Sequence, residues 1–276
     1  MSPTATPESE APWGTHAPTG WRRCWLRRLH AIPAGAGWRR LALWLRRPLK
    51  KAFGDDVDIE VWGLKLRVRS RGNLSEQRLL LMPQFLDTTE RDTLADFLRD
   101  GGVFFDIGAN AGIYSLWVGS LRLPGVRVEA FEPSPALCAR LGANLVRNQL
   151  DNIRLNPCAL GRTTGIATLV AGDGNQGENH VEAGDNHSGQ SVPITTLPAF
   201  LREHHIARID ALKIDVEGHE LDVLEPLFNE AHRESWPRLV ICEDVHDGDD
   251  RLARLLTAHG YTLARRGRLN GIYRLS

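Results

Sequence analysis

The spacing of apolar residues along 57–69 predicts a β-hairpin. Apolar side chains stand at every second position on both sides of a turn near Gly63, and alternate residues of a strand face the same side. Apolar residues spaced three or four apart then predict helices near 74–82 and 88–99. A longer and more regular pattern follows these elements.

From residue 103 onward, short apolar runs alternate with amphipathic stretches of helical spacing. The predicted strands cover 103–106, 126–131, 153–157, 210–215 and 238–242. The predicted helices cover 111–121, 134–149, 218–230 and 249–259. This alternation predicts an α/β fold, in which a mostly parallel sheet carries helices on both faces. Two further strands, 261–265 and 271–274, are close enough in sequence to pair antiparallel, and the glycine-rich segment 171–190 is predicted to be a mobile loop.

The beginning of the chain differs in composition from the rest. Residues 1–20 are predicted to form a disordered tail, and residues 21–52 are rich in Trp and Arg. A helical wheel starting at residue 38 gathers apolar side chains on one side and arginines on the other, until Pro48 ends the run. The apolar residues are Trp38, Leu41, Trp44 and Leu45, and the basic ones are Arg39, Arg40, Arg46 and Arg47.

Two interpretations of this amphipathic helix stand. A basic helix with Trp on its apolar side suits the surface of an anionic membrane. The same pattern suits a helix that docks on the protein's own core and leaves its arginines in water, which is the more common use of amphipathic helices.

The charge distribution separates this arm from the body of the protein. Residues 1–54 hold ten Lys or Arg and only two acids, which leaves 24 basic and 32 acidic residues over 55–276, a net charge of −8. An acidic body is a poor general binder of nucleic acid, so we expect no specific nucleic-acid partner. The four cysteines show no C-x-x-C spacing, and therefore predict neither a zinc site nor a redox pair.

The absence of long apolar runs bears on localisation. No stretch of 18 apolar residues exists, and the first twenty residues lack the apolar core of a secretory signal. We therefore expect a cytoplasmic protein, in which residues 21–52 either dock on the core or make peripheral contact with the inner face of the membrane.

A glycine loop stands where the first core strand meets a helix, the place where open α/β sheets bind ligands. It contains Asp106, Gly108, Ala109, Asn110 and Gly112. The spacing departs from the G-x-G-x-x-G dinucleotide fingerprint, which needs glycine at positions 110 and 113. An acid directly before the loop would repel a pyrophosphate, but it would attract the ammonium and sulfonium groups of S-adenosylmethionine. The loop therefore predicts an adenosylmethionine site.

Glu132 ends the second core strand, 24 residues after Gly108. A carboxylate at this position can accept a hydrogen bond from both ribose hydroxyls of a bound nucleoside. A lone acid at a strand end is otherwise a solvated surface group, and a nicotinamide-dependent oxidoreductase is the alternative enzyme class. The combination with the glycine loop favours the ribose role.

A second charged motif closes the fourth core strand, over residues 212–220. A charged side chain inside an apolar strand is costly unless it is paired. Lys213 and Asp215 face the same side by strand periodicity, so we expect them to pair. Four charged residues within eight at the carboxyl end of a strand predict a functional site.

These motifs resemble the FkbM family of methyltransferases over about residues 90–276. The stretches that carry the resemblance are FDIGANAG (105–112), EAFEP (129–133) and TTLPAFLREHHIARIDALKIDVEGHELDVL (195–224), with Asn144 and Asn148. The resemblance implies a Rossmann-like class I methyltransferase fold with a seven-stranded sheet, S-adenosylmethionine as donor, and O-methylation of sugar or polyketide hydroxyls. Pro198 and Glu225-Pro226 depart from the family pattern, outside the cofactor loop.

The expected domains follow from this resemblance. A tail and arm cover 1–52, the hairpin and helices of the catalytic unit cover 53–100, and the methyltransferase domain covers 101–276. The expected acceptor is a small molecule or a glycan. Besides the oxidoreductase, a catalytically inactive membrane-associated binding protein remains as an alternative function.

Methyl transfer to a hydroxyl needs a general base within hydrogen-bond reach of the acceptor. We favour Asp215 in this role, with Lys213 orienting it and Glu217 as a further catalytic candidate. His219 and His246 also follow the fourth and fifth strands, although His219 at a helix start is more typical of a surface residue.

A second carboxylate cluster follows the fifth strand. Glu243 and Asp244, together with Asp215, could offer oxygen ligands to Mg²⁺. The pair could equally be solvated acids that cap the next helix, so we assign no metal.

Overall fold

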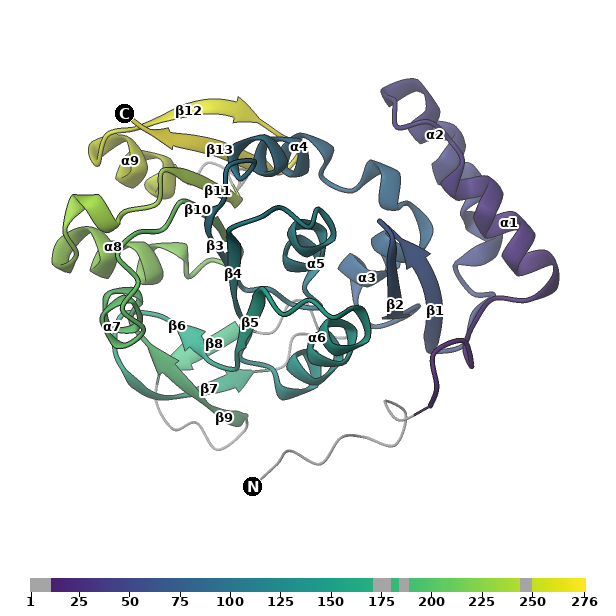
Figure 1. The fold of residues 1–276 in the computed structure, drawn as a ribbon, viewed down its shortest axis with the longest axis horizontal. Coiled ribbons are helices and arrows are strands. Elements are labelled where there is room, and N and C mark those ends of the chain that lie inside the picture. Colours follow the sequence, from purple (N-terminus) through teal and green to yellow (C-terminus); the bar gives the residue numbers. More distant parts are fainter. Residues whose placement is uncertain (1–10, 171–179, 184–188, 244–249) are drawn as a thin grey trace.

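The fold is built around one mixed sheet, which a computed structural model describes over residues 11–170, 180–183, 189–243 and 250–276. Within these residues, seven strands lie in the order β12-β13-β11-β10-β3-β4-β5 (Figure 1). The neighbours β11-β10-β3-β4-β5 run parallel, and β13 pairs antiparallel with both β11 and β12. The predicted α/β fold, a mostly parallel seven-stranded sheet closed by an antiparallel hairpin, is confirmed.

The strands and helices of this main unit lie close to their predicted positions. The strands are β3 (Gly102–Ile107), β4 (Val126–Phe131), β5 (Ile153–Asn156), β10 (Ala211–Ile214), β11 (Leu239–Glu243), β12 (Tyr261–Arg266) and β13 (Asn270–Leu275). The helices are α5 (Ile113–Ser120), α6 (Pro135–Asn148), α7 (Leu197–Glu203), α8 (Glu220–Glu230) and α9 (Arg251–Ala258), with a 3-10 helix η5 (Arg233–Ser235). Each predicted boundary falls within two residues of the observed one, except that α7 was not predicted.

Helices cover both faces of the sheet, α4 to α6 on one side and α7 to α9 on the other (Figure 1). Successive residues of a strand alternate between these faces. Phe104 accordingly packs in the hydrophobic cluster on the α5 side, whereas Phe105 packs in the cluster on the α8 side. Both rings are fully buried, which explains why β3 carries apolar residues at successive positions.

The predicted hairpin and helices precede the sheet in the chain. They are β1 (Asp56–Val61), β2 (Leu64–Arg69), α3 (Leu74–Leu81), η3 (Pro83–Phe85) and α4 (Thr88–Phe97). The hairpin packs on α3 and on α6, where the Asn144 side chain bonds both the N–H and the carbonyl of Arg67. The residues of this hairpin share one hydrophobic cluster with the α5 side of the sheet.

The arm consists of α1 (Gly20–His30), α2 (Ala36–Leu45) and η2 (Arg47–Leu49). It lies along the outside of the hairpin (Figure 1). The arm does pack on the body, because Leu26, Leu29 and Leu49 are buried. The core-docking interpretation is nevertheless wrong about which side of α2 faces water, since Ala42 is the buried residue and Trp38 and Trp44 are exposed.

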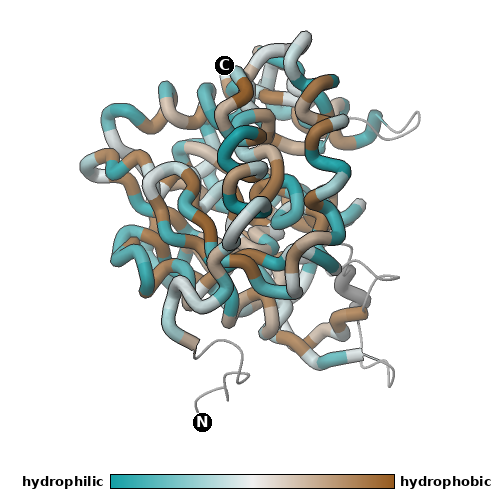
Figure 2. Tube along the Cα trace, turned by 90° about the vertical axis from the view of Figure 1, so that its right-hand side faces the viewer, coloured by the Kyte–Doolittle hydropathy of each residue, from teal (hydrophilic) through white to brown (hydrophobic). Residues whose placement is uncertain are grey.

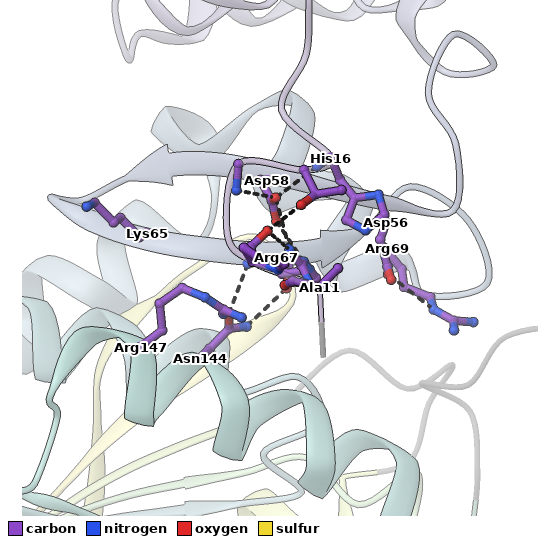
Figure 3. A network of polar contacts seen from close by, with 12 residues as sticks. Ala11, His16, Asp56, Asp58, Lys65, Arg67, Arg69, Asn144 and Arg147 are labelled. Carbon is purple, nitrogen blue, oxygen red and sulfur yellow. Dashed lines mark hydrogen bonds and ion pairs between the residues drawn. The ribbon is translucent and has the colours of Figure 1, made fainter. Parts of the chain in front are cut away.

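The tail segment 11–16 is fastened to the hairpin, so the prediction of a disordered tail is wrong beyond residue 10 (Figure 3). Asp58 and Arg67 form a buried ion pair with 2.8 Å between Nε and Oδ1. Asp58 also accepts hydrogen bonds from the N–H groups of Gly14 and His16, and Arg67 donates to the carbonyl of Ala11. Residues 1–10 lie outside the described residues.

A second, smaller sheet was not predicted. Its order is β6-β9-β7-β8, with strands β6 (Ala159–Leu160), β7 (Gly165–Val170), β8 (His180–Ala183) and β9 (Gln190–Thr195). The predicted mobile loop over 171–190 is therefore wrong at its strands, because β8 pairs antiparallel with β7. The segments 171–179 and 184–188 lie outside the described residues.

Among the helices of the described residues, none combines the length and apolarity needed to cross a bilayer.

Candidate active site

A cavity of about 360 Å³ opens at the carboxyl ends of β3, β4, β10 and β11. The chain leaves β3 for β4 on one side, and β10 returns on the other, so this is the switch point where open α/β sheets bind ligands. Its volume falls in the range of small-molecule sites. The cavity brings the glycine loop, Glu132 and the 213–219 segment together, as the sequence predicted.

The glycine loop folds tightly against the end of β10. Gly108 has φ +73°, and a Cβ on it would stand 1.9 Å from the carbonyl oxygen of Asp215, so only glycine fits here. Asn110 is also left-handed, at φ +55°, and its side-chain oxygen accepts a hydrogen bond from the Ala111 N–H. At Gly112, with φ +81°, a Cβ would collide with Leu141. The loop residues therefore have backbone reasons for their identities.

Glu132 is buried at the base of the cavity. Its two carboxylate oxygens accept hydrogen bonds from the Asn110 N–H and the Ser134 N–H, each 2.8 Å long. Burial raises the pKa of Glu132 to about 7, although those two N–H groups oppose the rise. No described side chain places a positive charge against this carboxylate strongly enough to offset its burial. The interpretation of Glu132 as a solvated surface acid is wrong.

Asp106 is buried and directed toward α5. Its Oδ2 accepts hydrogen bonds from the N–H and the hydroxyl of Ser115, at 2.9 and 2.6 Å. Burial raises the pKa of Asp106, while Ser115 and the charge of Lys213 pull it down. Asp106 lines the cavity, so its interaction with a ligand there would be electrostatic, while its hydrogen bonds fix the start of α5.

Lys213 and Asp215 form the predicted pair, with 3.2 Å between Nζ and Oδ2. Both residues line the cavity, but the Lys213 side chain is buried and the Asp215 side chain is 47% exposed, so the carboxylate is the more accessible partner. Burial lowers the pKa of Lys213, but Asp215 and Asp106 outweigh it and hold the pKa above its ordinary value. The ammonium also lies over the ring of Tyr114, 5.4 Å from its centroid. Lys213 is thus a buried cation held against the Asp215 carboxylate.

The loop after β10 is shaped by the buried Glu220. Its Oε1 accepts hydrogen bonds from the N–H groups of Val216 and Gly218, and Glu217 adopts a left-handed φ of +53°. Glu217 lines the cavity and is exposed. His219 also lines it, but its Nδ1 lies 2.9 Å from Asp222, which supports the expected surface role.

Several cavity residues belong to elements outside the sequence motifs. Arg78 and Asp87 form an ion pair 2.6 Å long beside the site, and Tyr114 donates to the other oxygen of Asp87 at 3.3 Å. Leu74 from α3 and Asn270 from β13 complete this side. No motif marks these positions, because they come together only when α3 and the C-terminal hairpin pack beside the strand ends.

The carboxylate cluster of Asp215, Glu243 and Asp244, to which the sequence analysis assigned no metal, lies only in part within the described residues. Glu243 lines the cavity, whereas Asp244 and His246 lie outside the described residues. Among those that are described, no group of three His, Cys, Asp or Glu side chains is arranged to hold a metal ion.

Comparison with known proteins places these features in a family. The family model described as "Methyltransferase FkbM domain" matches residues 106–263. The 31-O-demethyl-FK506 methyltransferase FkbM of Streptomyces tacrolimicus is 34% identical over 200 residues, which cover 60% of this chain and 75% of that protein. Methyltransferase 1 of Beauveria bassiana is 30% identical over 187 residues, covering 60% and 74%.

Among solved structures, the methyltransferase FkbM of Methylobacillus flagellatus aligns with 72% of this chain and 54% of its own, at 17% identity and a TM-score of 0.45. The family match spans the glycine loop, Glu132 and the Lys213–Asp215 pair. The resemblance inferred from the motifs is confirmed, and the chain belongs to the FkbM family of methyltransferases.

Proposed function

We propose that the protein transfers a methyl group from S-adenosylmethionine to a hydroxyl of a sugar, glycan or secondary metabolite. The donor would lie on the β3–β4 side of the cavity, over Gly108, Ala109 and Asn110 with its ribose at Glu132. The acceptor would enter beside Asp215. The family implies this cofactor, and the residues present fit it.

The observation that carries the proposal is the buried carboxylate of Glu132. A buried anion without a cation is costly, and among the described residues the carboxylate of Glu132 is compensated by two backbone N–H groups. A ribose has two neighbouring hydroxyls, and both can donate hydrogen bonds to the two oxygens of one carboxylate. The close packing of Gly108 against the Asp215 carbonyl holds the glycine loop beside the end of β10, so that the loop and Asp215 line one cavity.

S-adenosylmethionine, when bound, supplies a methyl group already activated by its sulfonium. The protein must then hold the acceptor oxygen in line and remove its proton. Asp215 is the candidate base, because its carboxylate is half-exposed, lines the cavity and is held by Lys213. Glu217 stands on the same rim and is the second candidate. The acidic rim and the charge of Asp106 favour a cationic cofactor.

Two findings support an oxygen acceptor. The carboxylates that line the cavity suit deprotonation of a hydroxyl. The name of the Streptomyces tacrolimicus relative, 31-O-demethyl-FK506 methyltransferase, assigns to that enzyme the transfer of a methyl group to oxygen. The acceptor side of the cavity mixes the apolar Leu74 and Leu269 with the polar Ser75, Arg78 and Asn270. Such a lining suits a hydroxylated molecule with an apolar skeleton.

The experiment is a pair of substitutions read by two assays. Glu132→Ala should weaken adenosylmethionine binding by about 1–3 kcal/mol in a calorimetric titration, the value of a charge-assisted contact. Asp215→Asn should bind the cofactor normally and lose at least about a hundredfold in turnover against a panel of hydroxylated acceptors. Asp222→Asn is the matched control, because Asp222 lies in the same segment but not on the cavity.

Each alternative predicts a different result. Wild-type cofactor affinity in Glu132→Ala would remove Glu132 from the site, and NADH binding tighter than adenosylmethionine would favour the oxidoreductase. Near-normal turnover of Asp215→Asn would assign the base to Glu217 or His246. Cofactor binding without turnover on any acceptor would favour the inactive binding protein.

A further inference from the structure

Helix α2 presents its apolar side to solvent. Trp38 is 51% exposed, Leu41 is 41% exposed and Trp44 is 61% exposed. These residues recur three apart, so they share one side of the helix. Large apolar side chains exposed singly are ordinary, but three on one helix side mark an interaction surface.

The other side of α2 is fastened to α1 and η2, so this exposure does not come from a loose helix. Ala42 is fully buried, and the Trp25 indole of α1 donates to the Leu45 carbonyl at 2.8 Å. The end of α1 is held by His30 Nε2, 2.8 Å from the Leu80 carbonyl oxygen. The packing therefore fixes Trp38, Leu41 and Trp44 outward as a preformed surface.

Positive charge surrounds this surface. The chain holds ten Lys or Arg and no acid between Glu10 and Asp55. Arg40 and Arg47 on α2 and η2 are exposed, and so is Trp21 at the start of α1. Figure 2 faces the side of the molecule on which α1 and α2 lie, and hydrophobic and hydrophilic residues alternate along the chain there. Trp interleaved with Arg is the composition of helices that lie in a membrane interface.

We propose that α1 and α2 dock the protein on an anionic lipid bilayer, with Trp38, Leu41 and Trp44 entering the headgroup region. Each basic residue near such a surface adds attraction, and the Trp rings add buried apolar area. A second copy of the chain is a poorer occupant, because the face would meet its own positive charge. A nucleic acid would have to lie beside a body of net charge −8.

The test uses the full chain and sedimentation with vesicles of pure phosphatidylcholine or of phosphatidylcholine with 30% phosphatidylglycerol, about the anionic content that creates a strong surface potential. The wild type should partition to the anionic vesicles and lose that binding as salt rises. Trp38→Ala/Trp44→Ala should lower the partition at least about tenfold. The matched control Val146→Ala/Ile166→Ala removes two apolar side chains that are exposed elsewhere and should bind like the wild type.

A second pair of variants tests the charges. Arg40→Gln/Arg47→Gln should lower binding to anionic vesicles about tenfold or more, whereas Arg99→Gln/Arg254→Gln, which removes exposed arginines of α4's end and α9, should not. Unchanged melting temperatures in all four double variants show that the fold is intact. Tryptophan emission should also shift to the blue with anionic vesicles in the wild type and less in Trp38→Ala/Trp44→Ala.

Three results would overturn the proposal. The first is no partition of the wild type to anionic vesicles at low salt. The second is a wild-type dimer in ultracentrifugation that Trp38→Ala/Trp44→Ala converts to a monomer. The third is tight, Trp38-dependent binding of a single-stranded oligonucleotide without vesicle binding. None of these readouts uses methyl transfer, so failure here is distinct from failure of the proposed enzyme activity.

Discussion

The pKa of Glu132 gives the cofactor site a pH dependence that can be measured. Burial raises this pKa to about 7 in the ligand-free protein. In the proposed complex the ribose hydroxyls would donate to the carboxylate, so they would bind its ionised form. Cofactor binding must therefore pull the pKa down, and binding near neutral pH must release protons from the protein.

The size of the effect follows from the titration of one group. With a pKa of about 7, Glu132 is about nine-tenths ionised at pH 8 and about one-tenth ionised at pH 6. Adenosylmethionine affinity should therefore fall roughly tenfold from pH 8 to pH 6. About half a proton should be released for each cofactor bound at pH 7.

The stability of the ligand-free protein should move in the opposite direction. The folded-state pKa of Glu132 lies above its unfolded value of 4.5, so the folded protein holds this proton more tightly. Ionising Glu132 then costs stability as the pH rises from about 4.5 to 7, by about 3 kcal/mol. Saturating cofactor should offset that loss and raise the melting temperature more at pH 8 than at pH 6.

Isothermal titration calorimetry in two buffers of different ionisation enthalpy measures the proton release directly. Glu132→Gln is the control, because it keeps the shape of the side chain and every titrating group of the cofactor itself. At pH 8 the affinity of Glu132→Gln for adenosylmethionine should be lower than that of the wild type. The affinity of this variant should also no longer show the part of the pH dependence that Glu132 supplies. An affinity that stays flat from pH 6 to pH 8 in the wild type, or a slope that Glu132→Gln retains in full, would refute the reasoning.

Two further predictions concern backbone packing and the arm. Gly108→Ala should abolish measurable cofactor binding and lower the melting temperature, because the new Cβ would lie 1.9 Å from the Asp215 carbonyl oxygen. The matched control is Gly125→Ala, since Gly125 has a similar φ of +72° and no close contact. This control should lower the free energy of unfolding in denaturant by only about 1–2 kcal/mol. Asp58→Ala removes the carboxylate partner of the buried Arg67 guanidinium, so it should lower the free energy of unfolding by about 3–5 kcal/mol. It should also expose the tail to limited proteolysis. Unchanged protease resistance would count against the network in Figure 3.

Local pattern was enough to predict the main sheet. Strands such as β3 and β11 are buried on both faces, so apolar residues stand at successive positions that a sequence pattern can find. The helices between them carry clear start signals, such as Ser134 at the N-cap of α6, whose side chain accepts from the Leu137 N–H. The sequence could place Lys213 and Asp106 at the same edge of the sheet. It could not predict that they stand opposite each other in the register of β10 and β3.

The second sheet and the tail show where sequence pattern fails. Strand β9 is mostly exposed and contains Pro193, a residue that argues against a strand unless it lies at an edge or bulge. β6 has only two residues. The tail at Gly14 and His16 is held by one carboxylate 42 or more positions away, and no local pattern encodes such a contact.

The outward side of α2 could not be predicted for a physical reason. A helical wheel shows that Trp38, Leu41 and Trp44 share a side, and the usual expectation is that this side packs inward. Helix α2 packs against η2 of the arm itself, and in this packing the small Ala42 is buried while the large rings of Trp38 and Trp44 lie outside. Steric fit, and not hydrophobicity alone, decided the orientation.

The buried carboxylates of this protein differ in how their charge is compensated, and the difference bears on function. Asp58 meets the guanidinium of Arg67, and Glu76 meets that of Arg140, so each serves the fold with a partner from the chain itself. Glu132 receives two backbone N–H groups and stays poised near neutrality with a pKa of about 7. Glu220 is also buried and accepts hydrogen bonds from two backbone N–H groups, but it does not line the cavity, whereas Glu132 does. Burial, a raised pKa and a place on the cavity together favour Glu132 as a ligand-binding residue, independently of the family to which the chain belongs.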